Sequence, residues 1–220
     1  MKRITGLVMI CLFIACNNNA ENKEKAEDTT AALEVEEVTE ENSEIEQAKV
    51  IFQPLFSFYE TNDSSFQEDN FNLAIMDSMS LMAPQAIDEA SLKPYYPYLV
   101  YNSDSSRAID LYSYNVMLSQ QNGKMVANAS GPDTEIAVVD FKNKTRQRIL
   151  FTGPSFIIHD GKWINDHTLS LIGGEVIDEE KFSPSVWLMD LDKQTMKVLD
   201  YADTLSLKHT AYKTSRLPFR

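Results

Sequence analysis

IAVVDFKNKT, residues 136–145, aligns with VWLMDLDKQT, residues 186–195, without a gap. Each copy is an apolar run, an aspartate and a polar stretch, and each leads into a second run that ends in an aromatic residue, Phe151 or Tyr201. This arrangement predicts a β-hairpin in each copy. Because the first run is apolar at successive positions, its strand is expected to lie between two packed layers and not at a wet edge.

Short runs rich in branched and aromatic residues surround these hairpins from Pro97 onward. Turn-forming pairs are expected to separate them at Asn122-Gly123, Gly131-Pro132, Asp160-Gly161 and Gly173-Gly174. The pattern predicts a mostly β fold of about eight short strands, built as an antiparallel sheet assembly or a partial propeller-like fold. The predicted strands are residues 98–101, 108–118, 135–141, 148–152, 156–159, 167–172, 186–191 and 196–201.

Residues 48–91 carry weaker signals and are expected to hold one or two short helices. The apolar residues around Leu55 fit a helix face or a strand, and residues 71–82 are equally open. A short helix is predicted over residues 85–92, with Pro94 as its stop. Met76, Met79 and Met82 form a stripe whose expected role is core packing, with a metal or hydrophobic-ligand groove as the alternative.

Trp163, within the stretch DGKW at residues 160–163, is followed by a strand and then by the second hairpin. This succession resembles one blade of the β-propeller repeats of TolB or WD40-like periplasmic proteins. The resemblance covers about two blades, from Pro97 to Asp203, whereas a closed propeller needs about four or more. It therefore implies a small two-layer sheet assembly, or a partial propeller that packs against the region before Ser91.

The first sixteen residues are expected to direct the chain to the cell envelope. Lys2 and Arg3 precede an apolar run that is too short to cross a bilayer as a helix, so residues 1–15 are expected to be a signal peptide. The run ends at Ala15-Cys16 and resembles the lipobox of bacterial lipoproteins, in which the cysteine is lipidated. Asn17 follows Cys16 where inner-membrane lipoproteins carry aspartate, so the resemblance implies the outer membrane of a Gram-negative bacterium, on its periplasmic or its surface side.

Residues 16–47 read as an acidic tether, because eleven acidic residues face two lysines and no aromatic residue. Such a segment buries too little apolar surface to fold, so an extended disordered linker is expected. It also resembles the surface-export signals of some Gram-negative lipoproteins. Residues 48–220 then form a single mainly β domain, large enough to bury its own core. The formal net charge is −13 and basic residues do not cluster, so nucleic acid is not an expected partner.

Few residues suggest chemistry, and no cofactor or metal is expected. His159 and Asp160, with Asp166 and His167, flank a predicted turn and suggest a hydrolase or metal-dependent enzyme as an alternative function. Asp140 and Asp190 occupy the same position in the two repeats, and each is expected to accept hydrogen bonds from the backbone of its own turn. The chain's only cysteines are Cys11 and Cys16, so a mature domain would have no disulfide.

Tyrosines crowd one short span and form the candidate ligand face. Flat amphipathic rings on one exposed surface suit a glycan or a protein partner. The expected function is therefore a membrane-anchored, non-catalytic binding module of the envelope, whose partners are the membrane, through its lipid, and an envelope protein or glycan. A small inhibitor or immunity-type lipoprotein is a further alternative. The tyrosines of the candidate face are Tyr95, Tyr96, Tyr98, Tyr101, Tyr112 and Tyr114.

Overall fold

The computed structural model describes residues 45–208 and Leu217. The predicted signal peptide, Cys16 and most of the acidic tether lie outside these residues. The described part forms twelve strands, all in antiparallel sheets, and a few short helices, which confirms the mostly β prediction. No helix in this part is both long and apolar enough to span a bilayer.

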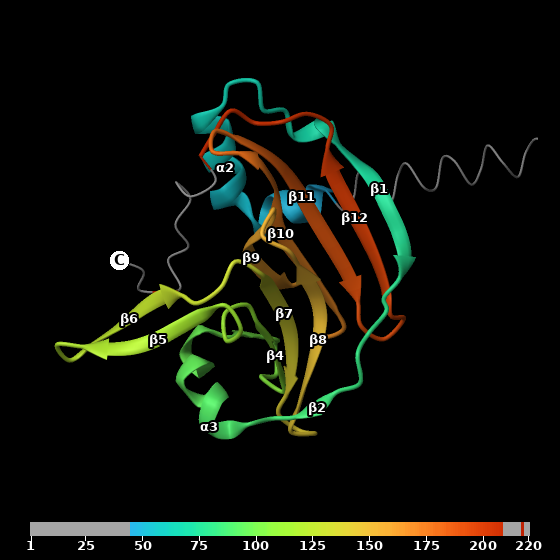
Figure 1. Ribbon diagram of the computed structural model, residues 1–220. Coiled ribbons are helices and arrows are strands. Elements are labelled where there is room, and N and C mark those ends of the chain that lie inside the picture. Colours follow the sequence, from blue (N-terminus) through green and yellow to red (C-terminus); the bar gives the residue numbers. More distant parts are fainter. Residues whose placement is uncertain (1–44, 209–216, 218–220) are drawn as a thin grey trace, which may run out of the picture. The chain divides into compact units, whose positions relative to one another are not determined.

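Ten of these strands form two five-stranded antiparallel sheets (Figure 1). The first sheet contains β1 (Phe71–Ser78), β9 (Phe156–Trp163), β10 (Thr168–Asp178), β11 (Lys181–Asp190) and β12 (Thr195–Tyr201), in the order β1-β12-β11-β10-β9. The second contains β2 (Gln85–Ala86), β3 (Val100–Tyr101), β4 (Arg107–Asp110), β7 (Thr134–Asp140) and β8 (Thr145–Thr152), in the order β2-β8-β7-β4-β3. A separate hairpin of β5 (Val116–Gln121) and β6 (Lys124–Ala129) projects from the body.

The two sequence repeats form the predicted hairpins, β7–β8 and β11–β12. They have the same register at the turn, where Asp140 pairs with Thr145 and Asp190 with Thr195. The last turn residue is left-handed in both copies, with φ of 52° at Lys144 and 55° at Gln194. The repeat in sequence is therefore a repeat in backbone conformation, and each hairpin lies at the corresponding place in its sheet.

The two sheets pack face to face around a shared core. Ile136 and Val138 of β7 pack in the same cluster as Trp187 and Met189 of β11. Residues between these positions point to the opposite face of each strand, because side chains alternate across a sheet. There Val139 packs into another cluster, so β7 is buried on both faces, as predicted.

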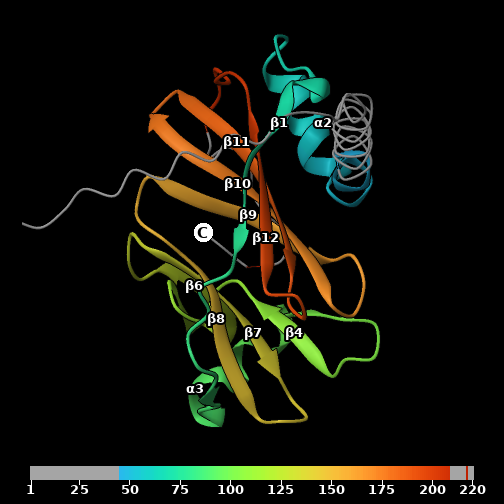
Figure 2. The same ribbon diagram turned by 90° about the vertical axis from the view of Figure 1, so that its right-hand side faces the viewer.

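Helices cover the outer face of the first sheet (Figure 2). Residues 45–51 and α2 (Gln53–Asn62) are helical, and Pro54 occupies the first turn of α2, where its missing N–H leaves no bond unmade. Phe52 and Tyr59 are almost fully buried against Phe182 and other residues of the sheet. Ile45 belongs to this core as well, so the folded body begins earlier than the expected boundary at residue 48.

A second helical segment covers the outer face of the other sheet. The helix predicted over residues 85–92 is wrong in its first half, because Gln85 and Ala86 form β2 on the edge of β8. Only α3 (Glu89–Leu92) is α-helical, and it begins after Asp88, whose carboxylate accepts from Ala90 N. Pro94 does not end the helical segment, since it lies in the first turn of the 3₁₀ helix η2 (Lys93–Tyr98). A shorter 3₁₀ helix, η1 (Glu68–Asn70), precedes β1.

Two of the predicted turns are wrong, because their glycines lie inside strands. Gly161 belongs to β9, where an added Cβ would lie 2.8 Å from Leu171 Cδ2 in the core. Gly173 and Gly174 lie in β10 beside a register shift, and a Cβ on Gly173 would lie 2.0 Å from Ile157 O. These glycines are needed for close approach of neighbouring chains and not for a reversal of direction.

The strands differ from the prediction in other regions as well, since β1 and β6 were not predicted as strands and β9, β10 and β11 are longer than expected. The single strand expected over residues 108–118 is two strands, β4 and β5, because the chain turns after Asp110. Asn122-Gly123 is the expected hairpin turn, with both residues at positive φ. Of the three methionines in the stripe, only Met79 is buried in the core, whereas Met76 and Met82 are exposed.

Candidate functional site

The seam cleft lies where the edge strand β3 of the second sheet runs beside the edge strand β9 of the first. Its volume is about 620 Å³. Aromatic, amide, hydroxyl, carboxylate and ammonium side chains share its lining. The lining residues are Leu99, Val100, Tyr101, Asn102, Ser103, Lys162, Trp163, Ile164, Asn165 and Asp166.

Two aromatic rings form the apolar part of the seam cleft. The indole N–H of Trp163 donates to Val100 O at 2.7 Å, which ties β9 to β3. The guanidinium of Arg107 lies 5.7 Å from the centre of the same ring. Tyr101 is 40% exposed and stacks on Phe141 at 5.7 Å. Burial raises the pKa of the Tyr101 hydroxyl above its ordinary value.

The polar wall of the cleft is held by bonds between two loops. Asp166 accepts hydrogen bonds from Ser103 Oγ at 2.6 Å and from Asn102 Nδ2 at 3.4 Å. Arg107 donates to the backbone carbonyl of Asp166. The side chain of Asn165 in turn accepts from two backbone N–H groups of its own loop. The loops are therefore ordered by the fold, and a ligand would meet side chains that are already in place.

A second cavity of about 500 Å³ adjoins the seam cleft and shares Trp163 and Ile164 with it. Its other lining residues come from the helix at residues 45–51. Val50 is 77% exposed there. This cavity was not predicted, because nothing in the sequence shows that the helix lies beside the end of β9.

The structure does not bring together the four residues of the enzyme hypothesis. Asp166 lines the seam cleft, and His167 lies next to it with Nδ1 2.7 Å from Asp192 Oδ2. His159 is buried on the helical side of the first sheet, where its ring lies 5.2 Å from that of Phe182. The carboxylate of Asp160 accepts a hydrogen bond from the N–H of Gly161, the next residue of its own strand. In the part of the chain that the structure describes, no three His, Cys, Asp or Glu side chains are grouped as metal ligands.

The six tyrosines of the candidate face are divided among several places. Tyr112 is buried, and the hydroxyl of Tyr95 donates to Val116 O. Tyr96 and Tyr101 both contact Phe141 beside the seam cleft. The hydroxyl of Tyr96 also donates to Glu89, which raises its pKa to about 12.

The remaining tyrosines separate further. Tyr98 is half-buried and packs against the shared core. Tyr114 is 46% exposed and packs against Phe151 on the outer face of the second sheet. The expected single tyrosine face is therefore wrong, and Tyr101 alone of the set lines the seam cleft.

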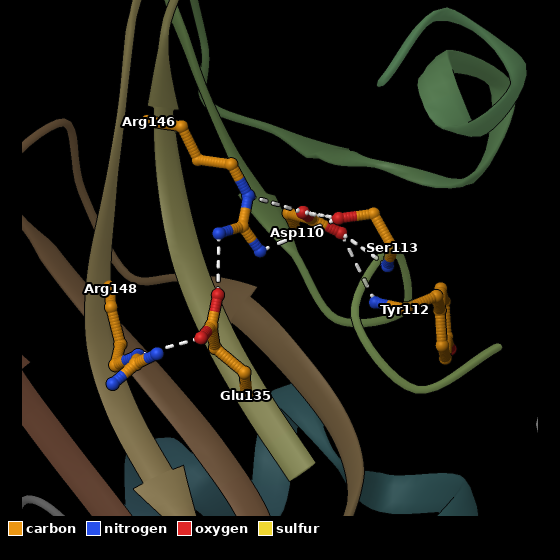
Figure 3. A network of polar contacts seen from close by, with 6 residues as sticks. All are labelled: Asp110, Tyr112, Ser113, Glu135, Arg146 and Arg148. Carbon is orange, nitrogen blue, oxygen red and sulfur yellow. Dashed lines mark hydrogen bonds and ion pairs between the residues drawn. The ribbon is translucent and has the colours of Figure 1, made fainter. Parts of the chain in front are cut away.

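A network of charged groups covers part of the outer face of the second sheet (Figure 3). Arg146 of β8 reaches between two carboxylates, with Nε 2.9 Å from Asp110 Oδ2 and Nη1 2.5 Å from Glu135 Oε1. Arg148 contacts the other oxygen of Glu135 at 2.6 Å. The Asp110 side chain is fully buried. Burial works to lower the pKa of Arg146, but the two carboxylates outweigh it and raise that pKa.

This network was not predicted, although charged residues next to apolar strand residues indicate that such partners exist. Asp110 interrupts an apolar run and Glu135 directly precedes one, and a charge at a buried strand position needs a partner. Asp110 also accepts from the backbone N–H groups of Tyr112 and Ser113, which explains the turn after β4. Both carboxylates of the network are paired with arginines, so the network supports the fold.

The repeated aspartates act as predicted. Asp140 Oδ1 accepts from Asn143 N at 2.8 Å, and Asp190 Oδ1 accepts from Lys193 N at 2.9 Å. The bond from Lys193 is the main reason that the pKa of Asp190 is lowered. These carboxylates are engaged by their own turns.

Comparison with protein-family models, curated proteins and solved structures found no match to this chain.

Proposed function

We propose that the chain is a lipoprotein of a Gram-negative outer membrane, anchored through Cys16, whose β body is a non-catalytic module that binds an envelope glycan. The observation that supports this ligand class is the lining of the seam cleft, in which exposed aromatic surface lies beside hydrogen-bonding side chains. The anchor rests on the basic start, the short apolar run and the cysteine that ends it.

A glycan matches this lining in two ways. The C–H faces of a sugar ring are apolar and pack on aromatic rings such as that of Tyr101, which binds at low cost in conformational entropy. Sugar hydroxyls both donate and accept, so they suit Lys162, Asn165 and the other polar side chains of the cleft. Because Asp166 is held by Ser103 and Asn102, this wall is ordered before a ligand arrives.

Binding without catalysis is favoured by the positions of the histidines and aspartates. A hydrolytic site requires a nucleophile or water, a base and an orienting group within hydrogen-bond reach of one another. His159 packs beneath the helices, whereas Asp166 lies in the loop after β9 and lines the cleft, so they do not form such a set.

The Tyr101→Ala variant is expected to weaken glycan binding about tenfold, because it removes the most exposed aromatic surface of the cleft. The measurement is isothermal titration of the full-length protein in detergent with peptidoglycan fragments and with lipopolysaccharide oligosaccharides. Tyr114→Ala is the matched control, since Tyr114 is similarly exposed (46% against 40%) but lies outside the cleft. Equal losses in the two variants, or release of cleaved sugar, would contradict the proposal.

The Cys16→Ser variant is expected to move the protein from the membrane fraction to the soluble fraction, because the lipid can no longer be attached. Cys11→Ser is the control, since Cys11 lies in the segment that cleavage would remove. Both variants are fractionated and detected by immunoblot. A Cys16→Ser protein that still sediments with outer membranes would remove the proposed anchor.

A further inference from the structure

The edge of β8 differs from the equivalent edge of the first sheet. In the first sheet, the edge strand β1 pairs with β12 along its whole length, from Phe71 opposite Tyr201 to Ser78 opposite Thr195. In the second sheet β2 pairs with only the first two residues of β8, Thr145 and Arg146. Among the described residues, no backbone hydrogen bond reaches the outer edge of β8 from residue 147 to residue 152.

Pro84 explains why β2 does not continue along this edge. It directly precedes Gln85 and would be the next residue to pair with β8, but proline has no N–H to donate to a ladder. The connection from β1 to β2 is held to β8 by a side chain instead, through the bond from Gln147 Nε2 to Met82 O. Beyond that point the strand offers its backbone groups to a further strand.

Side chains on the outer face of the same edge are arranged for recognition. Arg148 donates Nε to Glu135 and lies with its guanidinium 4.9 Å from the centre of the Phe151 ring. Its terminal nitrogens form no hydrogen bond or ion pair with the described residues, so the end of the guanidinium fork is available for a further bond and held in place from two sides. Phe151 is 45% exposed, and Tyr114 packs edge-on against it at 5.8 Å. Arginine with aromatic rings is the composition typical of the sites that dominate binding at protein interfaces.

We propose that the edge of β8 beyond Arg146 receives an extended antiparallel segment of another protein, which places a carboxylate on Arg148 and an aromatic ring beside Phe151. The end of an arginine fork pairs with a carboxylate through two parallel bonds. The internal copy shows how an aromatic residue fits: β1 places Phe71 against Tyr201, the counterpart of Phe151, with ring centres 5.3 Å apart. Strand addition supplies affinity through the backbone and selectivity through alternate side chains.

A second copy of this chain is a poorer occupant of the edge. Pairing β8 with itself would place Arg146 and Arg148 of both copies along one ladder, and like charges across a sheet are destabilising. In an antiparallel partner the residue opposite Phe151 precedes the one opposite Arg148. Relative to β7, β8 has one extra residue between these two, because Leu150 pairs with Ile136 and Arg148 with Ala137. A partner strand that passes this extra residue as β7 does therefore carries an aromatic residue followed, two positions later, by a glutamate or aspartate.

The test uses the full-length protein in detergent and two fluorescent peptides. Both are threonine-rich, one with Phe-Thr-Glu at its centre and the other with Phe-Thr-Lys. Fluorescence anisotropy is expected to give at least about tenfold tighter binding of the Glu peptide, and Arg148→Gln is expected to remove this difference. Arg148→Lys keeps the charge but not the fork and is expected to restore only part of it. Tyr101→Ala, in the seam cleft, should leave peptide binding unchanged, which separates this site from the glycan site.

Nuclear magnetic resonance gives an independent readout that does not depend on a folded Arg148 variant. Addition of the Glu peptide to the unmodified protein is expected to shift and protect the backbone amides of residues 147–152. Equal affinity for the two peptides, shifts confined to another surface, or a dimer formed through β8 in sedimentation would each overturn the proposal.

Discussion

The Asp110→Ala variant is expected to lose about 3 kcal/mol of its free energy of unfolding. The substitution removes a fully buried carboxylate that accepts from Arg146 and from the backbone of the turn after β4. Arg146 then keeps only Glu135 as a charged partner, and two turn N–H groups lose their acceptor. Urea denaturation followed by tryptophan fluorescence measures the loss as a lower midpoint at an unchanged slope.

Asp140→Ala is the matched control for this prediction. Its carboxylate also accepts from a turn backbone, but it is only half-buried and forms no ion pair with an arginine among the described residues, so a loss of about 1 kcal/mol is expected. The double variant Asp110→Leu with Arg146→Met should be more stable than Asp110→Ala, because no buried charge is left without its partner. Equal losses for Asp110→Ala and Asp140→Ala would show that the charge network contributes little to stability.

The Gly173→Ala variant is expected to be destabilised by about 3 kcal/mol or more, or to give no folded protein. An added Cβ would lie 2.0 Å from Ile157 O, and that oxygen belongs to the backbone of β9. The strand cannot yield without breaking its pairing with β10 at the register shift. Thermal unfolding monitored by circular dichroism provides the measurement.

Gly153→Ala is the corresponding control, because no heavy atom lies within 4 Å of the position of its Cβ. Gly153 has a negative or extended φ, so alanine is tolerated there and a change within about 0.5 kcal/mol is expected. A Gly173→Ala protein with the melting temperature of Gly153→Ala would mean that β9 and β10 are farther apart in solution than described here.

The hairpins were predictable because their signal is local. Ten aligned positions fix an apolar strand, an aspartate and its turn, and the carboxylates of Asp140 and Asp190 bond within that same stretch. Gly161 and Gly173 misled the prediction because turn propensity is also read locally. Their role is set by Leu171 and Ile157, side chain and backbone of neighbouring strands that no short window contains.

The candidate site was predictable only in part. Asp166 and Tyr101 were singled out for their chemistry, and both line the seam cleft. Their companions Asn102 and Lys162 are ordinary residues in sequence, and only the packing of β3 beside β9 brings them to the same cleft. His159 and Asp166 were grouped because they are close along the chain, but β9 carries them to different surroundings.

The ladder between β1 and β12 joins the beginning and the end of the described body. Phe71 therefore cannot find Tyr201 until almost the whole sequence is free to fold, and such long-range closure is slow because the loop entropy is lost before the contacts form. For a chain delivered through a membrane from its N-terminus, β1 would emerge first and wait for its partner strand. The first sheet can therefore be completed only when β12 is available. A chain truncated before β12 would leave the backbone groups of β1 unpaired and prone to aggregation.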